Sequence, residues 1–194
     1  MEKVKSKLFT TDKEIIGSLL NPVDANQWFV CSNQIYHWYP PIAEAIRPRS
    51  IGEIGCRWGY SLKALLEGWS DVNFVVGYDF ETYQPGSNDY CRKHLAPLFP
   101  KIPFTFHNQD TQKLDTLGNV CFDLFSVDGD HTTPGAYHDM NLVWPHIEDG
   151  GIMMVDDLTD TRVHQAWAQF TREKGLVGWY VPTLHGLGLV RKEG

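Results

Sequence analysis

Residues 50–68 read SIGEIGCRWGYSLKALLEG, and this stretch indicates the architecture of the whole chain. A short apolar strand at Ser50–Ile54 runs into a turn that contains Gly55 and Gly59. The next segment has apolar residues at helical spacing and stops at Gly68, as an amphipathic helix closed by glycine does. A strand, a glycine turn and a helix in this order predict the start of a parallel α/β domain.

The same alternation continues to the end of the chain. Further apolar runs of strand length lie at residues 74–78, 104–107, 122–127 and 152–155. Helices are expected over about 88–99, from near 132 to 144, and from near 160 to 175. Two β-like runs at 177–181 and 188–191 are spaced as a hairpin. We therefore expect an α/β fold, a Rossmann-like three-layer sandwich whose mostly parallel seven-stranded sheet includes an antiparallel last strand.

Residues 1–47 are expected to form a helical extension, either a lid or a docking segment, in front of one domain at residues 48–194. A first helix should end near Leu20, and a second should cover 34–46 with a bend or restart at Pro40. The second half of the extension is rich in aromatic residues, namely Trp28, Tyr36, Trp38 and Tyr39. These could cover a ligand cleft, dock the extension onto the domain, or form a dimer patch, which leaves a homodimer open.

Length and composition place the chain among soluble globular proteins. Its 194 residues are 42% hydrophobic and 21% charged, which suits one domain with a full core. The net charge of -7 argues against nucleic acid as a partner, because phosphate binding needs basic surface. With no apolar run of membrane length, no signal-peptide pattern and no Cys-x-x-Cys pair, we expect a cytoplasmic protein that acts on a small molecule.

Chemistry in an open parallel sheet is expected at the carboxyl ends of its strands. After the first strand, the backbone N–H groups at the start of the helix can receive an anionic group. The second strand ends at Asp79, about two dozen residues after Gly55, where a carboxylate can accept both hydroxyls of a ribose. Asp79 could instead be a turn residue. Asp110, after the third strand, could meet an adenine amino group or cap a helix.

Carboxylates gather after the fourth and fifth strands. The fourth ends in Asp128-Gly129-Asp130-His131, and the fifth ends in Asp156-Asp157. If these strands are neighbours, their ends lie about 5 Å apart. Asp128, Asp156 and Asp157 could then bind Mg²⁺, which prefers oxygen ligands, or could serve as caps and turn formers.

Two residues of this motif are candidates for taking a proton from the substrate, Asp130 and His131. For His131, the alternative is to cap the helix that starts near Thr132. Of the other histidines, His138 is expected to face solvent. His185, in the last turn, could reach the substrate but fits a surface turn better.

Four motifs in order resemble one family, the class I S-adenosylmethionine-dependent methyltransferases. They are the Glu53–Ser61 stretch, Gly77-Tyr78-Asp79, the Phe122–His131 stretch and the Gly150–Asp157 stretch. The resemblance spans about residues 50–191. It is nearest to a bacterial subgroup with an Asp-Gly-Asp-His motif, allied to metal-dependent O-methyltransferases. It implies the strand order 3-2-1-4-5-7-6 and an S-adenosylmethionine cofactor, with Mg²⁺ as an open second one.

The resemblance also implies roles for individual residues. The cofactor would be bound by Glu53, Gly55, Gly59, Tyr60, Ser61, Asp79, Asp110 and Asp128. Of these, Asp79 would hold the ribose and Asp110 would lie near the adenine. Asp128, Asp156 and Asp157 match metal ligands, and Asp130 matches a base, with His131 beside it. The chain lacks the lysine that follows the aspartate motif in caffeoyl-CoA-type enzymes, and little chain precedes the sheet to build a substrate lid.

These features predict a methyltransferase that acts on a small molecule, by O-methylation of a hydroxyl with Mg²⁺ assistance. Three alternatives stay open at this stage. One is a dinucleotide-dependent oxidoreductase, although the glycine pattern is Gly-x-x-x-Gly and not Gly-x-Gly-x-x-Gly. Another is a non-catalytic protein with a cofactor-binding fold. The third is a metal-free methyltransferase that uses Asp130 or His131 alone.

Overall fold

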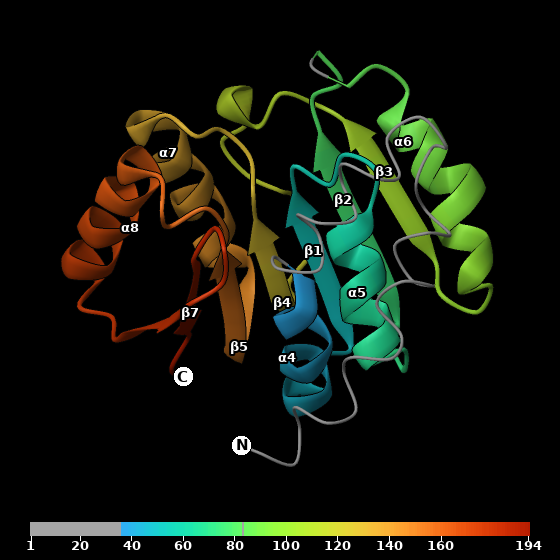
Figure 1. The fold of residues 1–194 in the computed structure, drawn as a ribbon, viewed down its shortest axis with the longest axis horizontal. Helices are drawn as coiled ribbons and strands as arrows, with labels where there is room; N and C mark the ends of the chain where they lie inside the picture. The colour runs from blue at the N-terminus through green and yellow to red at the C-terminus, as the bar shows by residue number, and fades with distance from the viewer. Residues whose placement is uncertain (1–35, 83) are drawn as a thin grey trace.

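The computed structural model describes residues 36–82 and 84–194. Seven strands form one sheet, in the order β3-β2-β1-β4-β5-β7-β6 (Figure 1). Their bounds are β1 Ser50–Ile54, β2 Phe74–Asp79, β3 Phe104–Asn108, β4 Phe122–Val127, β5 Ile147–Val155, β6 Gly178–Val181 and β7 Leu187–Arg191. The first five strands pair in parallel, and β7 pairs antiparallel with both β5 and β6. The predicted fold class and strand order are confirmed.

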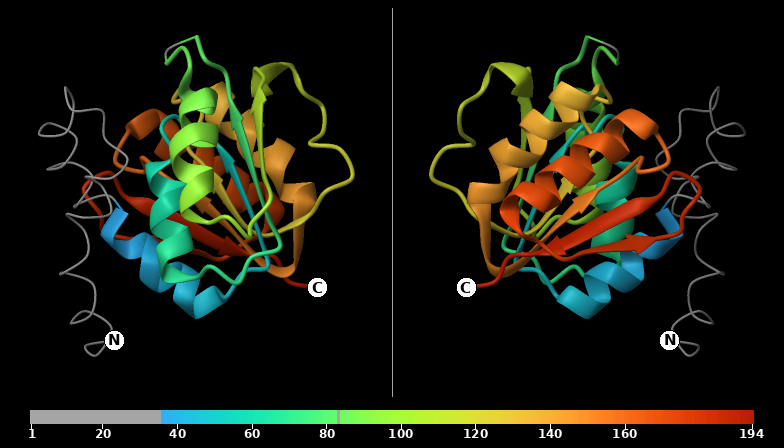
Figure 2. Two further views of the ribbon diagram at one scale, coloured as in Figure 1. Left: turned by 90° about the vertical axis from the view of Figure 1, so that its right-hand side faces the viewer. Right: turned by 90° about the vertical axis from the view of Figure 1, so that its left-hand side faces the viewer.

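Helices cover both faces of the sheet, as Figures 1 and 2 show. One face carries α4 (Tyr39–Ile46), α5 (Tyr60–Gly68) and α6 (Ser87–Tyr90), which continues through a π turn at Cys91–Leu95 and a 3₁₀ turn at Ala96–Leu98. The other face carries α7 (Thr133–Val143) and α8 (Thr161–Lys174). Short 3₁₀ turns lie at Tyr36–Trp38, Thr111–Lys113 and Trp144–His146. The result is the expected three-layer sandwich.

The central strands are apolar along their whole length because both of their faces are covered. In β4, Leu124 packs into the core under α4 and α5, and the next residue, Phe125, packs into the core under α7 and α8. Successive side chains of a strand point to opposite faces. Two cores therefore hold the sheet rigid between them, and its strand ends make a firm platform for a site.

Several boundaries differ from the expected ones by a residue, the helix expected over 88–99 is divided into α6 and the two turns that follow it, and two larger differences have identifiable reasons. Strand β5 begins at Ile147 and not at 152, because Ile147 already pairs with Phe122 before an irregular stretch and a second pairing of Ile152 with Leu124. The helix expected at 34–46 restarts at Tyr39, and Pro40 then lies in the first turn of α4, where its missing N–H costs nothing.

The helix expected near residues 11–20, and Trp28, lie outside the described residues. The described end of the predicted extension, α4, packs against α5. Among residues 36–82 and 84–194, no helix has both the length and the apolar character needed to cross a membrane.

Candidate functional site

The carboxyl ends of the parallel strands open into a cleft of about 1120 Å³. Gly55 after β1, Asp79 at the end of β2 and Asp128 after β4 all line this cleft, together with Asp110. The three strand-end positions that the sequence marked therefore meet at one place. A cleft of this size can hold a nucleoside-containing ligand and a small second molecule.

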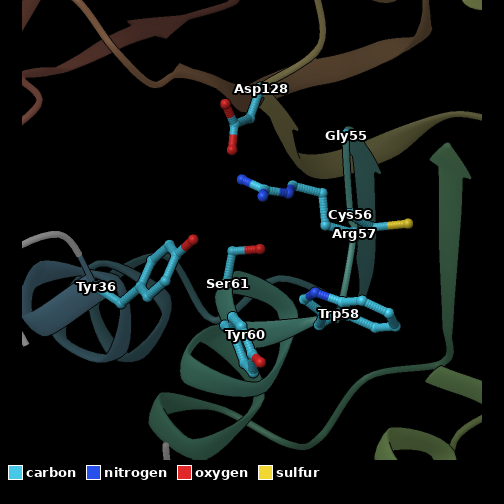
Figure 3. A pocket seen from close by; sticks show the side chains of 8 residues that line it. All are labelled: Tyr36, Gly55, Cys56, Arg57, Trp58, Tyr60, Ser61 and Asp128. Atoms are coloured by element: carbon cyan, nitrogen blue, oxygen red, sulfur yellow. The ribbon is translucent and has the colours of Figure 1, made fainter. Parts of the chain in front are cut away.

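A narrow recess joins the cleft at the start of α5 (Figure 3). Tyr60 and Ser61 from the first turn of this helix line the recess, and it shares Gly55 and Asp128 with the cleft. The N-terminal N–H groups of a helix attract a carboxylate or a phosphate. The recess therefore suits the anionic end of a ligand whose body lies in the cleft.

Gly55 is needed where the β1 and β4 loops converge. It has a φ of 82°, and a Cβ at this position would lie 1.8 Å from the backbone oxygen of Asp128. Gly59 contributes differently from what was expected. A Cβ there would meet Leu95 and Cys91, so Gly59 permits α5 to pack against the following helix and does not itself approach the cleft.

The Asp79 carboxylate holds the glycine loop in position. Its Oδ2 accepts a hydrogen bond from the backbone N–H of Arg57 at 2.5 Å, and Arg57 has a left-handed φ of 40°. Burial raises the pKa of Asp79, and the bond from Arg57 opposes that rise. Asp110 has the capping role considered for it, since it caps a 3₁₀ turn by accepting from the N–H of Gln112 at 3.1 Å, and it also lines the cleft.

Glu53 lies behind the recess with its side chain fully buried. Neither carboxylate oxygen has a well-formed hydrogen bond to any described residue, although the Ser61 and Ser126 hydroxyls are near enough to favour the ionised form. Burial is the largest influence and raises the pKa of Glu53 to about 8, and the negative charge of Asp128 adds to that rise. The site thus keeps an unsatisfied acid at its base, which is rare unless a ligand or function requires it.

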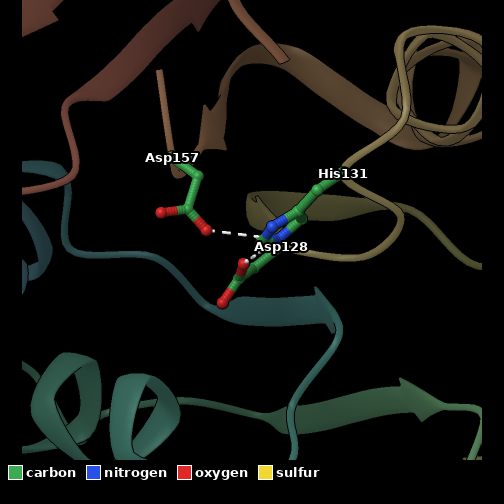
Figure 4. A group of neighbouring side chains, drawn as sticks. All are labelled: Asp128, His131 and Asp157. Atoms are coloured by element: carbon green, nitrogen blue, oxygen red, sulfur yellow. Dashed lines mark hydrogen bonds and ion pairs between the residues drawn. The ribbon is translucent and has the colours of Figure 1, made fainter. Parts of the chain in front are cut away.

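Asp128, His131 and Asp157 form a compact cluster on the cleft wall (Figure 4). His131 Nε2 lies 3.3 Å from Asp128 Oδ1 and 3.2 Å from Asp157 Oδ2, between the two carboxylates. The hydrogen bond to Asp128 is the main reason that the pKa of His131 rises to about 9. One atom of each of the three residues lies within 4.8 Å of the others, which is close enough for a shared ligand.

Asp156 lines the same cleft but has other partners. Its Oδ2 accepts a hydrogen bond from the Tyr39 hydroxyl at 3.3 Å, and its Oδ1 accepts from the N–H of Asp157 at 2.9 Å. Burial raises the pKa of Asp156, and the negative charges of Asp128 and Asp157 raise it further. The three carboxylates after β4 and β5 therefore influence one another, as expected.

The helix-cap alternative for His131 is wrong. Thr132 caps α7 by accepting from the N–H of Gly135 at 3.1 Å, and His131 turns to the carboxylates instead. The Asp130 carboxylate accepts from the N–H of Thr132 at 2.6 Å, so it is occupied at the start of the same helix. A short polar side chain before a helix readily accepts such a backbone bond.

Two further histidines differ from expectation. His138 does not face solvent, because its Nε2 lies 3.0 Å from the carbonyl oxygen of Thr111 and the residue is half-buried. His185 is not a plain surface-turn residue, since its Nδ1 lies 2.8 Å from Asp157 Oδ1 and it lines the cleft.

Of two further cleft residues, the sequence reasoning missed Arg57 and left the role of Tyr36 open. Arg57 extends its guanidinium into the recess toward Asp128 and was not considered, although a charged residue inside a glycine turn was a visible signal (Figure 3). Tyr36 lines both the cleft and the recess, which agrees with one of the alternatives left open for the aromatic residues. The contacts made in the folded chain were needed to decide among those alternatives.

Several solved structures have the same fold. A methyltransferase from Podospora anserina, PaMTH1, with S-adenosylhomocysteine bound, matches at a TM-score of 0.68 and 16% identity, over 100% of this chain and 95% of that one. An O-methyltransferase from Bacillus cereus, in complex with S-adenosylhomocysteine, matches at a TM-score of 0.63 and 16% identity, over 98% of this chain and 96% of that one. The O-methyltransferase TomG from Streptomyces achromogenes, in complex with S-adenosylmethionine, matches at a TM-score of 0.61 and 16% identity, over 99% of this chain and 95% of that one. At these identities the likeness shows the fold.

The family assignment comes from the sequence itself. No curated protein matches the chain significantly. A family model described as a methyltransferase domain matches residues 53–158, which is more than half of the chain and includes Gly55, Asp79 and the Asp128–His131 motif. This match favours methyl transfer over the dinucleotide alternative. The chain belongs to this methyltransferase domain family.

Proposed function

We propose that this protein is an S-adenosylmethionine-dependent methyltransferase that methylates a hydroxyl oxygen of a small molecule. The observation that carries the proposal is that Gly55, Asp79 and Asp128 line one cleft, which leads into a recess at the start of α5. Support comes from the family match and from solved structures of the same fold that hold S-adenosylmethionine or its product.

The residues present fit the cofactor. Ser61, Tyr60 and Gly55 would surround its methionine end, Asp79 would accept from its ribose hydroxyls, and Asp110 would lie near its adenine. Glu53, buried behind the recess next to Ser61, would supply negative charge near the amino group and sulfonium of the ligand when ionised. When bound, the cofactor supplies a methyl group that is already activated, so the protein has mainly to align the acceptor.

The acidic cluster fits a divalent cation. Asp128 and Asp157, which lie close enough to share a ligand, would hold Mg²⁺, which prefers carboxylate oxygens, and Asp156 beside them would be the third carboxylate. Burial together with mutual repulsion raises the pKa values of Asp128 and Asp156, a cost that a bound cation would offset. The ion would supply positive charge that favours the oxyanion form of the acceptor hydroxyl.

His131 is the better placed of the two candidate bases. Its Nε2 lies between Asp128 and Asp157 on the cleft wall, whereas the Asp130 carboxylate accepts from the backbone at the start of α7. We propose that His131 takes the proton from the acceptor hydroxyl in its neutral form, which is populated above its pKa of about 9, or at lower pH once a bound cation offsets the charges of Asp128 and Asp157 that raise this pKa. Tyr36 also forms part of the cleft wall, which suits a flat or partly apolar acceptor and would give the described end of the N-terminal extension a role in covering the site.

Titration calorimetry with S-adenosylhomocysteine and, separately, with NAD tests the cofactor. We expect binding of the first and none of the second, and the reverse result would overturn the proposal. Asp79→Asn should weaken S-adenosylhomocysteine binding severalfold. The exposed Asp71 offers a matched control, since Asp71→Asn should leave it unchanged.

Transfer of labelled methyl from S-adenosylmethionine to catechol, used as a probe diol, tests the metal. We expect activity to fall on thorough chelation and to return when Mg²⁺ is added back. Activity that is indifferent to chelation would remove the metal and leave His131 acting alone.

A further inference from the structure

The carboxylate of Asp157 is held between two histidines that come from different parts of the fold. His131, in the loop before α7, lies 3.2 Å from Asp157 Oδ2. His185, in the turn between β6 and β7, presents Nδ1 2.8 Å from the other oxygen, Oδ1. Each oxygen therefore has its own imidazole neighbour, and only one of these neighbours, His131, also contacts Asp128.

The turn that carries His185 is fastened to the segment that follows Asp157. The N–H of Thr159 donates to the carbonyl oxygen of His185 at 2.7 Å, and the N–H of Leu158 donates to the carbonyl oxygen of Gly186 at 2.9 Å. Within the turn, the N–H of Gly186 donates to Thr183 Oγ1 at 2.8 Å. The backbone of His185 is thus placed by the same residues that continue from Asp157, which brings its side chain to the carboxylate.

The backbone of Asp157 adopts a conformation that few residues take. Its φ of 61° lies in the left-handed region, which glycine and, less often, asparagine and aspartate tolerate. It also lies beyond the end of β5, outside the hydrogen-bonded ladder with β4. A hydrogen-bond donor on Oδ1 fixes the rotation of the carboxylate about the Cβ–Cγ bond, and this keeps Oδ2 turned toward His131 and Asp128.

We infer that His185 is a positioning residue that acts through Asp157. It holds Oδ2 in the place where Asp128 and Asp157 can share a divalent cation, as the hydrogen-bonded outer neighbours of metal ligands do in general. The inference rests on the proposed function, because the site it orders is the proposed metal site. It also assigns a task to the β6–β7 hairpin, which reaches the cleft through this contact.

The test compares variants that keep or lose the donor. His185→Ala and His185→Phe both remove it, and Phe preserves the bulk of the ring should Ala impair folding. His185→Asn keeps an N–H near the position of Nδ1. His164→Ala, on the exposed part of α8, is the matched control. Mn²⁺ binding, measured by calorimetry with saturating S-adenosylhomocysteine, is the main readout, and the affinity for S-adenosylhomocysteine is the second.

We expect His185→Ala and His185→Phe to weaken Mn²⁺ binding by about 10-fold or more, the effect usual for outer-shell partners. His185→Asn should recover most of the affinity, and S-adenosylhomocysteine binding should change in none of the variants. Wild-type Mn²⁺ affinity in both donor-less variants would overturn the inference alone, and so would an equal loss of both ligands, which would indicate a merely structural role. A wild-type protein that binds S-adenosylhomocysteine but no Mn²⁺ would overturn the proposed metal site and this inference with it.

Discussion

Tyr39 donates a hydrogen bond to Asp156 across 117 positions of sequence, with 3.3 Å between the hydroxyl and Oδ2. The contact joins α4, before the sheet begins, to the end of β5 in the middle of the site. Both side chains are buried, so the bond supplies a donor to a carboxylate that water reaches poorly. Removing one partner of such a bond costs more than the bond itself contributes, because the other stays buried and unsatisfied.

Tyr39→Phe is therefore expected to lower the free energy of unfolding by about 1–3 kcal/mol. Urea denaturation at pH 7 measures it. Tyr137→Phe is the control, since the Tyr137 hydroxyl bonds to Glu173 on an exposed face and its loss should cost within about 0.5 kcal/mol. Equal effects of the two substitutions would show that Asp156 does not depend on Tyr39.

Glu53→Gln should stabilise the ligand-free protein at high pH. The pKa of Glu53 is raised by burial from 4.5 in the unfolded chain to about 8 in the folded one, so the folded state binds the extra proton between these values. The contribution of this group to stability is greatest below 4.5, falls as the pH rises to 8, and is constant above 8. Each pKa unit corresponds to about 1.4 kcal/mol, so the whole window amounts to several kcal/mol.

Urea denaturation of the wild type and of Glu53→Gln at pH 5, 7 and 9 measures the difference between their free energies of unfolding. The advantage of Glu53→Gln should grow from pH 5 to 7 and by a smaller step from pH 7 to 9, because the contribution stops changing near pH 8, and the affinity of the variant for S-adenosylhomocysteine should be lower than that of the wild type. Glu44→Gln, at an exposed position on α4, should show no such trend. A constant difference at all three pH values would mean that Glu53 is ionised throughout.

Gly55→Ala should destabilise the protein strongly and abolish cofactor binding. The new Cβ would lie 1.8 Å from the Asp128 backbone oxygen, and backbone cannot give way as a flexible side chain can. Because this clash adds to the cost of the left-handed φ, we expect the free energy of unfolding to fall by roughly 3 kcal/mol or more. Gly118→Ala is the control, because Gly118 has a similar φ of 88° but no atom within 4 Å of its Cβ position. It should cost only about 1–2 kcal/mol for the conformation, and thermal unfolding compares the two.

His131→Ala should lower the kcat for methyl transfer by about 10²–10⁴-fold, the range usual for a lost general base. Asp130→Asn should lower it far less, because Asn can still accept the N–H of Thr132 at the start of α7. Affinity for S-adenosylhomocysteine, measured in parallel, should stay close to wild type in both. A larger loss from Asp130→Asn than from His131→Ala would reverse the assignment of the base.

Much of the fold follows from local patterns in the sequence. The runs at Ser50–Ile54 and Phe122–Val127 are apolar throughout because buried parallel strands face a core on both sides, and the structure has these two strands with the expected bounds. A strand such as β5 was harder to delimit. Its first part pairs through Ile147 alone before the exposed stretch Glu148–Gly150, so hydrophobicity did not reveal it.

The sequence by itself determined the layered α/β architecture, the strand order implied by its motifs, and the strand ends at which Gly55, Asp79 and Asp128 meet. The architecture and the strand ends depend on hydrophobic periodicity and turn residues, which are properties of neighbours along the chain, whereas the strand order is what the resemblance of the motifs to a known family implied. Only the tertiary structure decided that Thr132 and not His131 caps α7, that Tyr39 reaches Asp156, and that His185 holds Asp157. Such pairings depend on which of several possible acceptors lies within hydrogen-bond distance of a donor. The packed sheet and its loops alone establish those distances.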